Sequence, residues 1–269
     1  MNELDKKSLI KLAYLAIDAA KLAGNLILEH YKKDIEIKIK KDGSPLTIAD
    51  RSSNQSIVKS LSKTNFPIVS EEERELPFES RYYWLVDPLD GTKDFLDFND
   101  EFTINIALVD FDTPIIGIIY APGLDELYVG ILGKKAWAII RGIKKTVKLL
   151  PKRKTLKMAI SRFHNHADAN NFALENEISQ CEAIGSSLKY GRLIFGHVDV
   201  YPRLVGTSEW DTAAGQVIME SGGGKLLDWN TKEPLRYNKI NRRNGRFIAF
   251  RSPYVISDFK LQQFKTELI

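Results

Sequence analysis

The chain has 269 residues, with 39 basic and 35 acidic side chains, a net charge of +4 and 43% hydrophobic residues. This composition excludes a disordered or collagen-like chain, and the length is sufficient to bury a core without disulfides. The single cysteine, Cys181, excludes an intrachain disulfide and a cysteine-based zinc site. A charge excess of this size is too small to indicate a nucleic-acid partner by itself.

The N-terminal residues MNELDKKSLI contain two acids and no apolar core, so we expect no signal peptide. The longest apolar stretch, from Pro114 to Leu124, contains two prolines and is shorter than the ~20 residues that a membrane span requires. We therefore expect a cytoplasmic protein without a transmembrane segment. Peripheral association with a membrane stays open, and so does the oligomeric state.

Two helices and a strand are predicted at the N-terminus. Apolar residues recur at helical spacing over 8–31, which predicts an amphipathic helix. The segment DIEIKIK, over 34–40, alternates isoleucine with charged residues, which predicts a half-buried strand. A second helix is predicted over 47–63, where a Thr or Asp can cap its first turn.

A sheet of several strands is predicted next. Short apolar strands over 67–70 and 82–88 each end directly in acids. Two strands follow around a turn at 110–114, and a further antiparallel pair is joined by a Gly-Lys-Lys turn at 133–135. We expect residues 1–150 to form an α+β half with an antiparallel sheet and to bind metal.

A domain boundary is predicted in the segment 141–157, which concentrates Lys and Arg around Pro151. The later elements are strands over 157–161, 182–186 and 198–202, and helices over 168–179, 187–195 and 210–220, the last ended by three glycines. Because helices and strands alternate here, we expect residues 151–269 to form a smaller α/β half.

Six acids stand beside a predicted strand end, turn or helix start: Asp50, Glu71, Glu72, Asp87, Asp90 and Asp211. Taken singly, each is explained by helix capping or by solvation. Asp87 and Asp90, however, follow a buried strand only three residues apart, and two such carboxylates repel each other unless a cation neutralises them. Oxygen ligands in a chain with one Cys and four His favour Mg²⁺ over zinc, and Mg²⁺ commonly binds phosphate as well.

Several ordered motifs resemble one family. VSEEE (69–73), WLVDPLDGTKDF (84–95), EFTINIALVD (101–110) and WDTAAG (210–215) resemble the signatures of the inositol monophosphatase superfamily of Mg²⁺-dependent, lithium-sensitive phosphatases. DGSPLTIAD (42–50), GIIYAP (117–122), AISRFH (159–164) and IGSSLKY (184–190) resemble its 3'(2'),5'-bisphosphate nucleotidase branch. The resemblance implies a layered αβαβα sandwich.

The resemblance also implies the residues of a metal centre. The implied ligands of two or more Mg²⁺ ions are Glu71, Asp87, the Leu89 backbone carbonyl, Asp90 and Asp211, with Asp87 bridging two ions. Besides Glu71, the implied catalytic residues are Asp50 and Thr92, which assist the attacking water, with Asp50 as the proton acceptor. Glu72 is either an orienting residue or a solvated acid.

The resemblance implies that the half at residues 151–269 recognises the substrate, and it implies a second set of residues for this role. Ser186, Lys189 and Arg203 would hold the phosphate that is not cleaved, and His164 would contact the nucleotide. The substrate would also meet Asp90, Gly91, Thr92 and Asp211. The turn at Gly91 offers backbone N–H groups at a helix start, where anions bind. In the alternative interpretation Ser186 caps a helix, and Lys189 and Arg203 are solvated.

The implied reaction is hydrolysis of the 3'-phosphate of adenosine 3',5'-bisphosphate, with the 3'-phosphorylated sulfate donor as a second substrate. An inositol monophosphatase or a sugar bisphosphatase with the same metal centre is the alternative within the enzyme class. A nucleic-acid-binding role is a different class, and it would use the run Lys144, Lys145, Lys148, Lys152, Arg153, Lys154 and Lys157. Such a run is more often a solvated hairpin edge.

Overall fold

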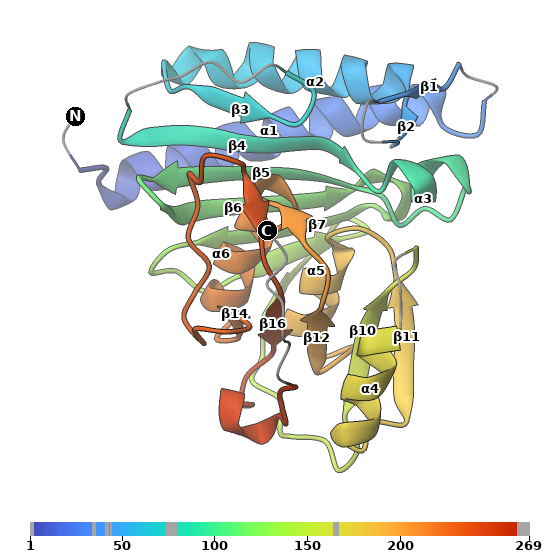
Figure 1. Cartoon of the computed structure of the whole chain (residues 1–269). Coiled ribbons are helices and arrows are strands. Elements are labelled where there is room, and N and C mark those ends of the chain that lie inside the picture. The colour runs from blue at the N-terminus through green and yellow to red at the C-terminus, as the bar shows by residue number, and fades with distance from the viewer. Residues whose placement is uncertain are drawn as a thin grey trace.

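The computed structural model describes residues 3–33, 36–40, 43, 45–73, 80–163 and 167–262. Figure 1 shows these residues in five layers: two helices, a large sheet, two more helices, a smaller sheet and an outer helix. The layered αβαβα arrangement is therefore confirmed.

The first layer contains α1 (Lys6–His30) and α2 (Ile48–Leu61), and both predicted helices are confirmed. Five alanines lie in the buried face of α1, and such small side chains let α1 pack closely on α2 and on the large sheet. Thr47 is the N-cap of α2, and its backbone N–H donates to the Asp50 carboxylate at 2.7 Å. This capping box fixes Asp50 in the first turn of the helix.

The prediction of a half-buried strand before α2 is wrong. The strand β1 (Lys38–Ile39) has only two residues and pairs with β2 (Pro45–Leu46). Ile37 is 48% exposed and Ile39 is 68% exposed, because a two-stranded sheet has no second layer to cover its apolar side chains. Asp34 and Ile35, which begin the predicted strand, lie outside the described residues.

The large sheet has seven strands in the order β3-β4-β5-β6-β7-β8-β9. They are β3 (Ile68–Ser70), β4 (Tyr82–Asp90), β5 (Thr103–Asp110), β6 (Thr113–Ala121), β7 (Glu126–Ile131), β8 (Trp137–Ile140) and β9 (Ile143–Thr146). Neighbours are antiparallel except β3 and β4, so the expectation of an antiparallel sheet is wrong at this one pair. Because parallel strands end at the same edge, Glu71 after β3 and the acids at the end of β4 meet there.

The middle layer contains α5 (Leu188–Ile194) and α6 (Ala213–Ser221). A Cβ atom on Gly117 of β6 would lie 2.2 Å from the Ala214 carbonyl oxygen, and one on Gly130 of β7 would lie 2.7 Å from Ile218. Both strands therefore require glycine where α6 crosses them. The predicted end of this helix is confirmed, since Gly222 caps it and Gly223 has a positive φ of 82°.

The smaller sheet has five strands in the order β11-β10-β12-β16-β14, and α4 (Ala167–Glu175) packs on its outer face. Its strands are β10 (Lys157–Ser161), β11 (Gln180–Ile184), β12 (Val200–Arg203), β14 (Lys225–Asp228) and β16 (Phe247–Phe250). The three predicted strands exist, although β11 begins and ends two residues earlier than expected. The C-terminal strands β14 and β16 were not predicted.

The remaining short elements connect these layers. They are α3 (Thr92–Leu96), β13 (Thr207–Ser208), β15 (Arg243–Asn244), and the 3-10 turns η1 (Ser62–Thr64), η2 (Pro122–Leu124), η3 (Glu209–Asp211) and η4 (Ile256–Asp258). In the described part of the chain, no helix combines the length and the apolar character needed to cross a membrane. The division into halves at residues 150 and 151 stays a prediction.

The basic run begins on the outer edge of the large sheet and ends on β10 of the smaller sheet. Its first lysines lie on β9, whose four residues are all exposed. Further along, Lys152 pairs with Asp258 at 2.6 Å and Arg153 pairs with Asp199 at 2.7 Å. Because acids of the same chain already neutralise part of the run, its placement favours a solvated sheet edge over a nucleic-acid surface.

Candidate active site

A cavity of about 390 Å³ brings together predicted residues from both halves of the chain. The predicted residues that line it are Glu71, Asp87, Leu89, Asp90, Gly91, Thr92, Ser186, Lys189, Arg203 and Asp211. Asp50 is buried directly behind Thr92, whereas His164 lies outside the described residues. Apart from His164, the structure therefore gathers the predicted metal and substrate residues in one place.

The N-terminal acids are positioned by the parallel pair β3 and β4. Glu71 directly follows β3, and its backbone N–H donates to the Val86 carbonyl of β4 at 3.2 Å. The end of β4 is held by α2, where the Ser53 hydroxyl donates to the Pro88 carbonyl at 2.6 Å. The β4–β5 register shifts between Asp87 and Asp90, so β4 is irregular where it carries these acids.

Three carboxylates form a cluster at this point. One oxygen each from Asp87, Asp90 and Asp211 lies within 4.8 Å of the others. The Leu89 backbone N–H donates to Asp87 Oδ1 at 3.1 Å, and the Ser208 N–H donates to Asp211 Oδ2 at 2.8 Å. In both carboxylates the described hydrogen bonds reach one oxygen and leave the second free to bind a ligand.

Asp90 connects the cluster to the C-terminal half. The backbone N–H and the hydroxyl of Ser187 lie 2.7 and 2.6 Å from Asp90 Oδ2, and Asn105 Nδ2 donates to the same oxygen at 3.2 Å. Neither Ser187 nor Asn105 was singled out from the sequence, although both lie inside quoted motifs. The turn before α5 is therefore tied directly to an acid of β4.

The cluster fits a divalent cation. Burial, followed by repulsion from Glu71, Asp90 and Asp211, raises the pKa of Asp87 well above its ordinary value. Burial and the same kind of repulsion raise the pKa of Asp211 to about 8. Within the described ranges, none of the three clustered acids forms an ion pair with a basic side chain. Oxygen donors alone, with uncompensated negative charge, suit Mg²⁺.

The pKa shifts predict a pH-dependent stability of the metal-free protein. The raised pKa values of Asp87 and Asp211 mean that protonated carboxyls favour the folded state, so stability falls as pH rises from about 4 to about 8. We expect the Tm in EDTA to be lower at pH 8 than at pH 6, and Mg²⁺ to raise it more at pH 8. Thermal unfolding at both pH values checks this, and an equal effect of Mg²⁺ would contradict it.

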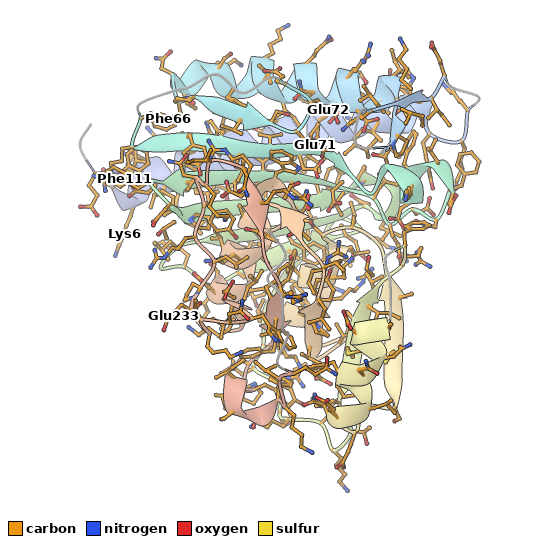
Figure 2. The ribbon with its side chains drawn as sticks, in the orientation of Figure 1. Lys6, Phe66, Glu71, Glu72, Phe111 and Glu233 are labelled. Atoms are coloured by element: carbon orange, nitrogen blue, oxygen red, sulfur yellow. The ribbon has the colours of Figure 1, made fainter. Side chains whose placement is uncertain are left out.

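Glu71 and Glu72 share a lysine partner. Lys40 Nζ donates to Glu71 Oε1 at 2.8 Å and also pairs with Glu72. Figure 2 labels both glutamates, which directly follow β3. The Glu72 side chain is only 8% exposed, so the interpretation of Glu72 as a solvated acid is wrong. Glu73 is exposed and accepts a hydrogen bond from Asn54 at 2.8 Å.

Asp50 and Thr92 form a second polar pair beside the cluster. The Thr92 hydroxyl donates to Asp50 Oδ1 at 3.2 Å, and the Thr47 N–H and hydroxyl both reach Asp50 Oδ2. Burial raises the pKa of Asp50, although the hydrogen bonds from Thr47 oppose the shift. The same hydroxyl also lies 3.3 Å from the Leu89 carbonyl oxygen. With its one proton donated to either acceptor, the Thr92 oxygen can accept a hydrogen bond from a water molecule in the cavity.

Two buried cations lie across the cavity. Lys189 is 5% exposed and Arg203 is 7% exposed, so the interpretation of both as solvated side chains is wrong. Lys189 Nζ donates to the Ile184 carbonyl at 2.8 Å and lies 5.3 Å from the centre of the Tyr201 ring. Arg203 Nε is buried and has no hydrogen-bond partner among the described residues. Burial lowers the pKa of Lys189 to about 8, a shift that the negative charge of Asp90 opposes.

Ser186 does not cap α5. The N-cap is Ser187, and Ser186 has a positive φ of 41° with its hydroxyl donating to the Glu101 carbonyl at 2.6 Å. Sequence reasoning assigned no role to two further cavity residues, Arg162 and Arg243. Arg162 lies in a quoted motif, but no local pattern distinguishes Arg243.

The layered fold and a cavity with acids on one wall and buried cations on the other are typical of metal-dependent phosphate hydrolysis. Comparison with known proteins agrees with this class. Residues 8–255 match the model of the inositol monophosphatase family. The chain therefore belongs to the inositol monophosphatase family.

Several similar proteins belong to the 3'(2'),5'-bisphosphate nucleotidase branch of that family. The chain is 38% identical over 250 residues to the 3'(2'),5'-bisphosphate nucleotidase CysQ of Buchnera aphidicola, covering 90% of this chain and 92% of the relative. The crystal structure of CysQ from Bacteroides thetaiotaomicron has a TM-score of 0.79 and 37% identity, covering 90% of this chain and 97% of that one. An inositol monophosphatase from Zymomonas mobilis has a TM-score of 0.72 and 27% identity, with 88% and 91% covered. The predicted family and branch resemblance is confirmed.

Proposed function

We propose that the chain is a Mg²⁺-dependent 3'(2'),5'-bisphosphate nucleotidase that converts adenosine 3',5'-bisphosphate to AMP and phosphate. The observation that carries the proposal is that one cavity contains both the carboxylate cluster and the buried pair Lys189 and Arg203. A substrate with two phosphates needs both features, whereas a monophosphate needs only the first. The named relatives with 38% identity support the same substrate class.

Most of the acids in the cavity would bind metal ions beside the reacting phosphate. Glu71, Asp87, Asp90, Asp211 and the Leu89 carbonyl would hold the metal ions. Bound Mg²⁺ would polarise the phosphoryl oxygens and acidify a water molecule.

Two further side chains would orient the attacking water and accept its proton. Thr92 orients the water through its hydroxyl oxygen, and Asp50 accepts the proton that leaves when the water oxygen bonds to phosphorus. The bond from phosphorus to the 3' oxygen then breaks, and that oxygen takes up a proton from solvent.

The second wall of the cavity would bind the phosphate that stays on the nucleotide. The buried Nε of Arg203 has no hydrogen-bond partner among the described residues, and a phosphate oxygen would accept a hydrogen bond from it. Lys189 adds a buried positive charge, and Ser186 adds backbone polar groups at the turn before α5. The same surface would accept the 3'-phosphorylated sulfate donor as a second substrate. The single cysteine fits a reducing cytoplasm, where this hydrolysis would take place.

Phosphate release from adenosine 3',5'-bisphosphate and from inositol 1-phosphate, measured side by side with Mg²⁺, tests the proposal. We expect faster release from the nucleotide, with loss of activity in EDTA and inhibition by lithium. A preference for inositol phosphate would retain the metal centre and reject the proposed substrate.

A further inference from the structure

Arg162, at the end of β10, lies between two acids on the cavity wall. Its buried Nε lies 3.4 Å from Asp94 Oδ1, an ion pair without a hydrogen bond among the described residues. Its Nη2 pairs with Glu101 Oε2 and donates to the Ala183 carbonyl at 3.2 Å. Asp94 is only 2% exposed, and Asn99 Nδ2 also donates to it at 2.7 Å. This group lies outside the carboxylate cluster, and the mechanism above assigns it no role.

Glu101 connects Arg162 to the turn before α5. The Gly185 N–H donates to Glu101 Oε2 at 2.7 Å, and the Ser186 hydroxyl donates to the Glu101 carbonyl at 2.6 Å. The packing is tight, because a Cβ atom on Gly185 would lie 2.5 Å from Asp94 Oδ1 and 2.8 Å from Glu101 Cβ. Both acids that pair with Arg162 therefore contact this turn directly.

The turn has two separate anchors. Its first residues, Gly185 and Ser186, are held by Glu101, whereas Ser187 is held by Asp90. Loss of the first anchor would free the end of the turn that faces the second phosphate. The second anchor, at Asp90, would remain.

We propose that Arg162, Asp94 and Glu101 form a positioning unit that sets the affinity of the second-phosphate wall without taking part in phosphate transfer. The proposal rests on the proposed bisphosphate substrate. Arg162 acts through Glu101 and the turn, because two carboxylates already neutralise its charge. Glu101 is the central residue of the unit, since its Oε2 contacts both the Arg162 guanidinium and the Gly185 N–H.

The first test compares two substrates. In Arg162→Ala we expect the KM for adenosine 3',5'-bisphosphate to rise about tenfold, as expected for loss of a charged hydrogen bond, with kcat little changed. The KM for adenosine 3'-monophosphate, which lacks the second phosphate, should stay at the wild-type value. Arg162→Lys should recover part of the loss, because lysine keeps the charge but not the planar fork. Arg236→Ala, which removes an exposed arginine paired with Asp112, is the matched control.

A double-mutant cycle separates positioning from direct contact. Glu101→Gln should raise the same KM, and the Arg162→Ala/Glu101→Gln double variant should be no worse than the poorer single variant. Additive effects would mean that Arg162 contacts the substrate directly, and an equal change for both substrates would mean a general structural role. Either result would overturn the proposal.

A substrate-independent readout covers the case in which the proposed function is wrong. Amide hydrogen exchange of Gly185 should be about tenfold faster in Arg162→Ala than in the wild type, because its N–H loses a fixed acceptor. Exchange of Ser187 should stay at the wild-type rate, because Asp90 still accepts from its N–H. Unchanged exchange would refute the positioning unit. A wild-type protein that does not hydrolyse the bisphosphate would instead refute the proposed function, and the exchange result would still stand.

Discussion

Asp87→Asn is expected to reduce metal-dependent phosphate release by at least about a thousandfold, which corresponds to about 4 kcal/mol of transition-state stabilisation. Asp87 is 1% exposed and lies at the centre of the acids Glu71, Asp90 and Asp211. An amide of the same shape keeps one oxygen but lacks the charge that a bridging ligand needs. Phosphate release at saturating Mg²⁺ measures the loss.

The same variant should not unfold the chain. Because burial and neighbouring acids raise the pKa of Asp87, its ionised form destabilises the metal-free protein at neutral pH. We therefore expect Asp87→Asn to have an equal or higher Tm in EDTA than the wild type. Asp97→Asn, at an exposed acid shortly after β4, is the matched control and should keep wild-type activity. A fully active Asp87→Asn protein would disprove the bridging role.

Asp50→Asn is expected to lower kcat about a hundredfold, the range typical of losing a general base, with a smaller change in KM. Asparagine can still accept the hydrogen bond from the Thr47 N–H that caps α2, so the helix should persist. The amide cannot accept the proton of the attacking water. Steady-state kinetics and circular dichroism distinguish the two effects.

The pH profile provides a second readout for Asp50. Burial raises the pKa of Asp50, and the wild type should lose activity as pH falls through that pKa, because a protonated acid cannot act as a base. In Asp50→Asn this acidic limb should disappear from the residual activity. Asp18→Asn, at an exposed acid on α1, should leave the profile unchanged. An unchanged acidic limb in Asp50→Asn would assign the base to another group.

Local patterns were sufficient for most helices and for the strands of the large sheet except β9, which lies in the segment predicted as a domain boundary. A prediction from local patterns needs only residues that are neighbours in the sequence. Three such predictions are confirmed: the alanine-rich helix α1, the end of α6 at its glycines and the buried strand β4. The same reasoning was wrong for β1, because alternation over a few residues does not reveal whether another layer covers the strand. The C-terminal strands β14 and β16 are short and were not predicted.

The sequence by itself determined the family, the acids Asp87 and Asp90 and the type of metal that such acids prefer, since these depend on residue identity and short spacing. Only the tertiary structure decided that β3 runs parallel to β4, and that Ser187 reaches Asp90 across 97 positions of the chain. It also decided that Lys189 and Arg203 are buried and that Arg162 lies between two acids. These features require segments from both sheets to meet at one cavity, and no local pattern encodes the packing that brings them together.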